Sequence, residues 1–186
     1  MKDIPIRYSL SNDKTIKLDP KKQIVDVISY CLMPNHFHFL LKQIINEGIK
    51  SFVSKTTNSY AKYFNIKHKR KGPLFEGVFK AVRIDTNEQL LHVSRYIHLN
   101  PLVGYVTDDL NSYKWSSYLE FVKGLEGICS KDVILSQFTS RKKYERFVLD
   151  HEQYGKKLER IKHLLFGEND DFPVVYAQNT PGVFYK

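Results

Sequence analysis

Two histidines separated by one residue, His36 and His38, are the first side chains whose types and spacing could do chemistry. They lie in an aromatic and aliphatic run that predicts a β-strand, and alternate side chains of a strand share a face. Two imidazoles side by side on a strand can ligate one divalent cation. Such a pair can also cap a sheet face or bind phosphate weakly, so both interpretations remain open.

A second set of polar side chains is spaced for one face of a helix. His92, Tyr96 and Asn100 follow one another at intervals of four residues, which places them on one stripe. Asn100 could add an oxygen ligand to a cation held by the histidines, and Tyr96 would then lie beside a bound phosphate. A phenol becomes a competent nucleophile when its proton is removed and charge is withdrawn from phosphorus. Tyr96 could instead be a packing residue with a hydrated hydroxyl.

The surrounding sequence predicts the elements that must position these groups. Residues 24–32 and 36–41 are two strand-like runs joined by a Met-Pro-Asn turn, which predicts a β-hairpin. Apolar residues at helical spacing predict a helix over residues 47–64. Residues 74–84 return to strand character.

The second predicted helix carries Tyr96. Asp85 is expected to cap it, with Glu88 as the partner in a capping box, and Pro101 is expected to end it. Beyond it we expect two amphipathic segments and a loop-like tail, at 130–138, 141–166 and from Gly167 onward. This order of elements predicts an α+β fold, with a small antiparallel β-sheet flanked by α-helices and a C-terminal helical extension.

Composition and charge limit the class of protein. The chain has 186 residues, 42% of them hydrophobic, which is enough for a packed core. No apolar run is long enough for a membrane span, the N-terminus does not resemble a secretory signal, and two cysteines make no disulfide framework. We therefore expect a cytoplasmic protein. Of the net charge of +9, +7 lies in residues 31–105, and a localised positive field attracts polyanions such as nucleic acid.

Four stretches of this chain resemble a known family in order and spacing. The chain resembles the one-tyrosine HUH transposases, specifically the REP-associated tyrosine transposase (IS200-like) branch. The likeness covers about residues 23–120. Its four stretches are YCLMPNHFHFLL (30–41), GPLFEGVFKA (72–81), RYIHLNPLV (95–103) and YKWSSY (113–118).

This resemblance implies an architecture and a reaction. The implied fold is the ferredoxin-like one of HUH nucleases. Residues 1–22 would form a lead-in, 23–125 the catalytic domain and 126–186 a C-terminal helical extension and tail. The implied activity is metal-dependent nicking and strand transfer of single-stranded DNA through a 5′-phosphotyrosine.

Each functional position of the family can be matched to a residue of this chain. The resemblance implies His36 and His38 as metal ligands, Asn100 as the third ligand and Tyr96 as the nucleophile. The implied cofactor is Mg²⁺ or Mn²⁺. A crystal could hold Ni²⁺ or Zn²⁺ instead.

The expected partner is single-stranded or hairpin DNA, bound by a monomer or a homodimer. Exposed aromatic residues near Trp115 could stack on unpaired bases, although Trp115 could equally pack beneath its turn. Lys50, Lys55 and Lys62 are further candidates for DNA contact. The side chains that we assign to phosphate contact are Lys67, Lys69, Arg70, Lys71, Lys80 and Arg83.

The chain departs from the family at its start. Family members usually have a further strand and helix before the hairpin, and residues 1–22 show no clear equivalent. The chain could be a truncated, catalytically inactive derivative that binds hairpin DNA. Alternatively, a second chain or the C-terminal extension could support the sheet. A third hypothesis is an unrelated metal-dependent hydrolase that uses His36 and His38.

Overall fold

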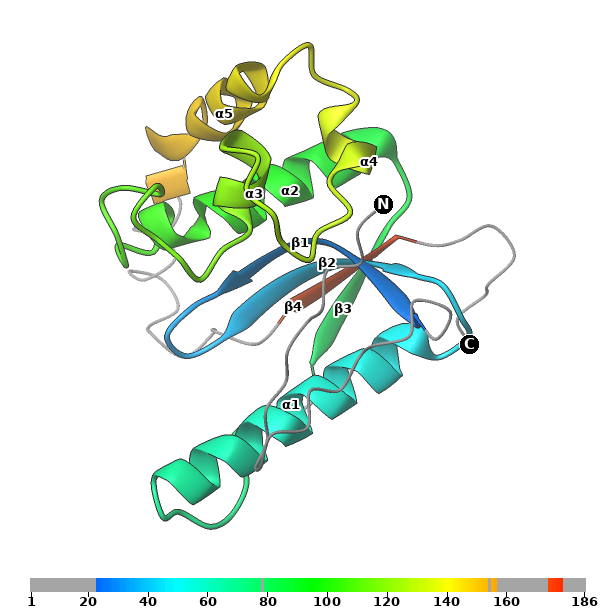
Figure 1. Ribbon diagram of the computed structural model, residues 1–186, viewed down its shortest axis with the longest axis vertical. Helices are drawn as coiled ribbons and strands as arrows, with labels where there is room; N and C mark the ends of the chain where they lie inside the picture. The colour runs from blue at the N-terminus through cyan, green and yellow to red at the C-terminus, as the bar shows by residue number, and fades with distance from the viewer. Residues whose placement is uncertain (1–22, 78, 154, 157–173, 179–186) are drawn as a thin grey trace.

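The computed structural model describes residues 23–77, 79–153, 155–156 and 174–178. Two strands, a helix, a third strand and a second helix make up its first half, and three short helices and a last strand follow (Figure 1). The elements in chain order are β1 (Val25–Leu32), β2 (Phe37–Gln43), α1 (Gly48–Lys67), β3 (Lys80–Ile84), α2 (Asn87–Val103), α3 (Tyr118–Val122), α4 (Asp132–Leu135), α5 (Arg141–Leu149) and β4 (Val174–Gln178).

The strands form one four-stranded sheet in the order β1-β2-β4-β3. β1 and β2 pair antiparallel, as the predicted hairpin requires, whereas β4 runs parallel to both β2 and β3. The α+β fold with a small sheet and flanking helices is therefore confirmed. The sheet is mixed, however, and only its hairpin is antiparallel.

The C-terminal strand corrects one expectation. The tail from Gly167 was predicted to be loop-like, yet β4 lies inside the sheet, where Val174 is the backbone partner of both His38 and Lys80. Its sequence, VVYAQ, includes β-branched and aromatic residues, which favour a strand when neighbours are available. The C-terminal segment thus supports the strand that carries His38.

The sheet has a hydrophobic cluster on each face. One cluster joins the sheet to α2, α3 and α5, with Leu40, Ile97 and Phe121 fully buried. The other lies under α1, which packs on Phe37 and Phe39. Figure 1 shows α2 to α5 on one side of the sheet and α1 on the other. β2 therefore buries alternate side chains on two faces.

Close packing fixes the start of α1 against the sheet. A Cβ atom on Gly48 would lie 2.3 Å from the carbonyl oxygen of Ile24, so only glycine allows this approach. Ile49 and Val53 bury the first turns of the helix. The predicted helix over 47–64 is confirmed, and it extends to Lys67.

Two boundaries around β3 differ from the prediction. β3 is restricted to Lys80–Ile84, because Pro73 and Gly77, with φ at +67°, interrupt the preceding chain. The cap of α2 is Thr86, whose Oγ1 accepts a hydrogen bond from the Gln89 N–H at 3.1 Å. Gln89 accepts one from the Thr86 N–H at 3.2 Å in return. The predicted capping box is real but lies one residue beyond Asp85 and Glu88.

Proline does not end α2. The helix contains Pro101 and continues to Val103, with Gly104 as its cap. The carbonyl oxygen of Pro101 accepts hydrogen bonds from the Val106 and Thr107 amides, which fold the next segment back on the helix. Pro101 has no N–H to donate to the Ile97 carbonyl oxygen, and only two residues of the helix follow it.

The rest of the predictions fall partly outside the described residues. Helices α4 and α5 lie within the predicted amphipathic segments 130–138 and 141–166, and residues 157–166 are outside the described part. The expected lead-in at 1–22 also lies outside it. Within the described ranges no helix combines the length and apolarity needed to cross a membrane. The cytoplasmic location stays a prediction.

Candidate active site

His36 and His38 face each other across a short gap at the start of β2. His36 immediately precedes the strand, and His38 is its second residue. Their Nε2 atoms lie 3.0 Å apart, and the rings meet edge to face with centroids 4.8 Å apart. His38 is buried, at 3% exposure. The strand alternation therefore brings the two imidazoles together as predicted.

The neighbouring asparagine orients the first imidazole. His36 Nδ1 lies 2.7 Å from Oδ1 of Asn35. An amide oxygen only accepts hydrogen bonds, so Nδ1 of His36 carries the proton. In the neutral ring, Nε2 of His36 then carries a lone pair, and it lies 3.0 Å from Nε2 of His38. Sequence reasoning treated Asn35 only as a turn residue.

Tyr96 lies beside this pair of rings. The Tyr96 ring packs edge to face on the His38 ring, with centroids 5.5 Å apart. Tyr96 is 49% exposed, whereas the adjacent Arg95 and Ile97 are buried on the other side of α2. The structure thus brings Tyr96 to the histidines within one chain and does not bury it in the core.

Asn100 follows Tyr96 by one turn of α2. Its Nδ2 donates to the backbone oxygen of Tyr96 at 3.2 Å. With Nδ2 engaged in this way, Oδ1 is the amide atom that could ligate a cation. Asn100 is half-buried at the end of the helix that carries Tyr96.

The donor set fits a divalent cation. Two ligand nitrogens in adjacent positions around Mg²⁺, each at about 2.1 Å, lie about 3.0 Å from each other. This is the separation of the two Nε2 atoms. The described residues contain no group of three or more His, Cys, Asp or Glu that could hold a metal ion. A cation here would therefore draw further oxygen ligands from an amide, water or phosphate.

A buried polar network positions α2 above the sheet. His98 Nδ1 lies 2.8 Å from the Tyr144 hydroxyl, and its Nε2 lies 2.7 Å from Oγ of Ser117. Ser117 accepts from the Tyr30 amide at 2.9 Å, so the network reaches β1. Burial lowers the pKa of His98 to about 3, and the ring is neutral at physiological pH. His98 therefore ties the helix of Tyr96 to α5 and to the sheet.

His92 does not join the site. Its Nδ1 accepts a hydrogen bond from Arg95 at 2.5 Å, and its Nε2 lies 3.7 Å from Glu88. Arg95 is buried against Phe147, with its guanidinium carbon 4.4 Å from the ring centre. Desolvation lowers the pKa of Arg95. Of the predicted stripe, Tyr96 and Asn100 lie together, and His92 stabilises the packing of Arg95.

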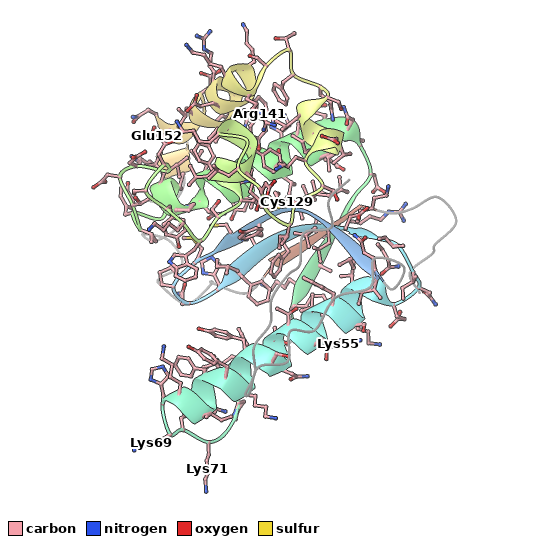
Figure 2. The ribbon with its side chains drawn as sticks, viewed as in Figure 1. Lys55, Lys69, Lys71, Cys129, Arg141 and Glu152 are labelled. Carbon is pink, nitrogen blue, oxygen red and sulfur yellow. The ribbon has the colours of Figure 1, made fainter. Side chains whose placement is uncertain are left out.

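The predicted phosphate contacts form two groups. Lys67 ends α1, and Lys69, Arg70 and Lys71 follow it in the loop at the far tip of the helix, where Figure 2 labels Lys69 and Lys71. Lys80 and Arg83 lie on β3, at the edge of the sheet. All six are exposed.

Some of these cations have protein partners. Arg83 pairs with Asp85 at 2.5 Å, and Arg70 donates to the Pro73 carbonyl oxygen at 3.0 Å. Lys50, a further candidate, pairs with Glu47 at 2.9 Å. The tip of α1 is thus a more open cationic surface than the base of that helix.

Trp115 points out from the protein. It is 65% exposed, so the alternative in which it packs beneath its turn is wrong. Its backbone oxygen accepts a hydrogen bond from the Leu32 amide at 2.8 Å, and the Tyr113 hydroxyl donates to the Leu32 oxygen at 2.6 Å. These bonds attach the Trp115 turn to the end of the β-hairpin that carries His36.

The comparison with protein families bears on this site. The family model described as "Transposase IS200 like" matches residues 14–100, a segment that includes His36, His38, Tyr96 and Asn100. The match supports the IS200-like transposase family. It thereby supports a transposase-type function in DNA processing. No curated protein and no solved structure matches the chain.

Proposed function

We propose that this IS200-like chain nicks and rejoins single-stranded DNA through a covalent bond to Tyr96. The observation that carries the proposal is the contact between the half-exposed Tyr96 ring and His38, whose Nε2 lies 3.0 Å from that of His36. A half-exposed phenol beside two imidazoles is accessible to a polymer and lies close to nitrogens that can hold a cation.

The reaction exchanges one ester bond for another. The phenol oxygen attacks phosphorus, the bond from phosphorus to the 3′-oxygen breaks, and the 5′-phosphate becomes bonded to Tyr96. The phenol proton passes to a nearby base, and the departing 3′-oxygen takes up a proton. A 3′-hydroxyl later attacks the phosphotyrosine and restores the phosphodiester. Because each step conserves the ester bond, joining needs no external energy source.

His36, His38 and Asn100 would hold a divalent cation, Mg²⁺ or Mn²⁺. When bound, the cation would withdraw charge from the phosphate. Asn35 fixes the ring of His36 so that Nε2 presents its lone pair, and such orientation by a neighbour is typical of metal-binding histidines. The burial of His38 holds the second ring in place.

The substrate that we propose is a DNA hairpin with a single-stranded flank. The basis is the motif likeness to the REP-associated branch, together with the exposed cations of the α1 tip. The contact between Tyr96 and His38 of the same chain supports action by a single chain, so that a dimer is not needed for chemistry.

A labelled oligonucleotide tests the nucleophile. A hairpin library with randomised single-stranded flanks, labelled at the 3′ end, is incubated with Mn²⁺ and resolved on a denaturing gel. We expect a labelled protein band with the unchanged chain and with Tyr105→Phe, an exposed tyrosine just after α2, and no band with Tyr96→Phe. An undiminished band with Tyr96→Phe would contradict the assignment.

The same gel separates the other hypotheses. Shortened strands with unlabelled protein would indicate a hydrolase. Binding without a band under any divalent cation would indicate an inactive DNA-binding derivative. Either result would overturn the proposed strand transfer.

A further inference from the structure

The distal half of α1 extends beyond the sheet. The helix has 20 residues, about 30 Å of length, but its buried residues are confined to its first two turns: Gly48, Ile49 and Val53. Figures 1 and 2 show the helix continuing past the sheet to a tip that carries Lys69 and Lys71. We call residues 57–71 the α1 arm.

The α1 arm carries aromatic side chains that the core does not cover. Tyr60, Tyr63, Phe64 and Lys67 are spaced as one helical stripe. Tyr60 and Tyr63 are 50% and 45% exposed, with ring centroids 6.3 Å apart. Lys67 lies over the Tyr63 ring, its Nζ 5.5 Å from the centre. Exposed aromatic faces beside cations suit a ligand with both flat rings and negative charge.

The charge of this region is of one sign. Residues 48–75 contain seven lysines or arginines and no aspartate or glutamate. This segment therefore carries positive charge with no acidic side chain within it, which favours a polyanion over a neutral or basic protein surface. A polynucleotide supplies both phosphates for the cations and flat bases for the rings.

Ring contacts connect the α1 arm to the strand of the candidate site. Phe37, between the two histidines, meets the Phe75 ring at 6.0 Å, and Phe75 meets the Tyr60 ring at 6.1 Å. Phe37 points to the α1 face of the sheet, opposite the imidazoles. A strand leaving the site would therefore pass around the end of β2 to reach the arm.

We propose that the α1 arm binds the unpaired flank of the DNA substrate by stacking bases on Tyr60 and Tyr63. Lys67 and the loop cations that follow it neutralise the phosphates. The inference rests on the proposed function, because the flank continues the strand that is cut at Tyr96. The arm spans about 20 Å, enough for about six stacked nucleotides.

Substitutions on the same helix separate stacking from general apolar contact. Tyr63→Leu removes the aromatic face and keeps an apolar, helix-forming side chain, whereas Tyr63→Phe keeps the face. Ile66→Ala is the matched control, since Ile66 is aliphatic and 69% exposed on the same arm. Circular dichroism and a thermal melt of each variant establish that the helix is intact.

Fluorescence anisotropy with labelled oligo(dT) of about 20 nucleotides measures the contact. We expect Tyr63→Leu to raise Kd about tenfold, with Tyr63→Phe and Ile66→Ala within about twofold of the unchanged protein. Lys67→Ser should lower the slope of log Kd against log salt by about one, and Lys50→Ser, at the ion-paired base of the helix, should not.

Two results would overturn the inference. One is unchanged binding by Tyr63→Leu. The other is an equal loss in Ile66→Ala, because a protein partner or a second copy of the chain would use aliphatic and aromatic contacts alike. The covalent band that the unchanged protein forms with a short-flanked hairpin is a separate readout. No band, together with normal oligo(dT) binding, would overturn the proposed function but not this inference. A band, together with oligo(dT) binding that the arm substitutions do not weaken, would overturn this inference but not the proposed function.

Discussion

The hydroxyl of Tyr144 offers a quantitative test of how α2 is held in place. The hydroxyl lies 2.8 Å from His98 Nδ1 and 3.4 Å from Oγ of Ser94, and Tyr144 and His98 are both fully buried. Tyr144→Phe removes only this oxygen and leaves Nδ1 of His98 without its partner. Ser94 keeps a hydrogen bond to the Leu91 carbonyl oxygen at 2.9 Å, so most of the effect falls on His98.

Leaving a buried polar atom without a partner costs about 1–3 kcal/mol. We therefore expect Tyr144→Phe to lower the free energy of unfolding by about 2 kcal/mol, which shifts the urea midpoint by about 1 M. Tyr113→Phe is the matched control, because its hydroxyl donates to the Leu32 oxygen in a solvent-exposed position. It should cost about 0.5 kcal/mol.

Urea unfolding followed by circular dichroism measures both variants. A loss for Tyr144→Phe no larger than that for Tyr113→Phe would refute the role of the His98 network. If the folded Tyr144→Phe variant also loses the covalent DNA band, the His98 network positions Tyr96, because Tyr144 itself does not contact the described site.

Three further predictions concern single groups. Burial lowers the pKa of His98 to about 3, below its value in the unfolded chain, so its contribution to stability is complete above about pH 6.5 and falls as the pH drops toward 3. The His98 ring signals in NMR should not titrate between pH 7 and 5, and a midpoint near 6.5 would contradict the burial. Burial raises the pKa of the Cys31 thiol to about 12 and also raises that of Cys129, so neither should react with a disulfide reagent at pH 8 until the protein unfolds. His38→Ala should weaken Mn²⁺ binding in calorimetry at least tenfold. Equal affinity in this variant would contradict the assignment of the histidine pair as the cation site.

The local features of the site could be predicted from the sequence. Strand alternation is enough to place His36 and His38 on one face, and helical spacing is enough to place Asn100 one turn from Tyr96. The contact between Tyr96 and His38 depends on how α2 packs on the sheet. The family resemblance implied that contact, whereas spacing alone left it open.

Non-local contacts account for most of what the sequence did not predict. β4 becomes a strand only because β2 and β3 offer it partners far away in the chain. The role of Asn35 depends on the turn that directs its amide at His36. In the sequence, His98 is one more polar residue near Tyr96. Its partners Tyr144 and Ser117 come from distant parts of the chain, and only the fold places them around its ring.

Smaller errors arose where two residues compete for one role. Asp85 and Thr86 are both good helix caps, each followed three residues later by a suitable partner, and the backbone selects Thr86.

Pro101 is a residue type that usually ends a helix. In the structure α2 nevertheless continues for two residues beyond it, to Val103.

The most direct test of strand transfer is to locate the nucleotide on the protein. The covalent complex formed with Mn²⁺ is digested with nuclease and protease, and the peptides are analysed by mass spectrometry. The account predicts a nucleotide attached through phosphate to Tyr96. A nucleotide on any other residue, or cut DNA with no modified peptide, would contradict it.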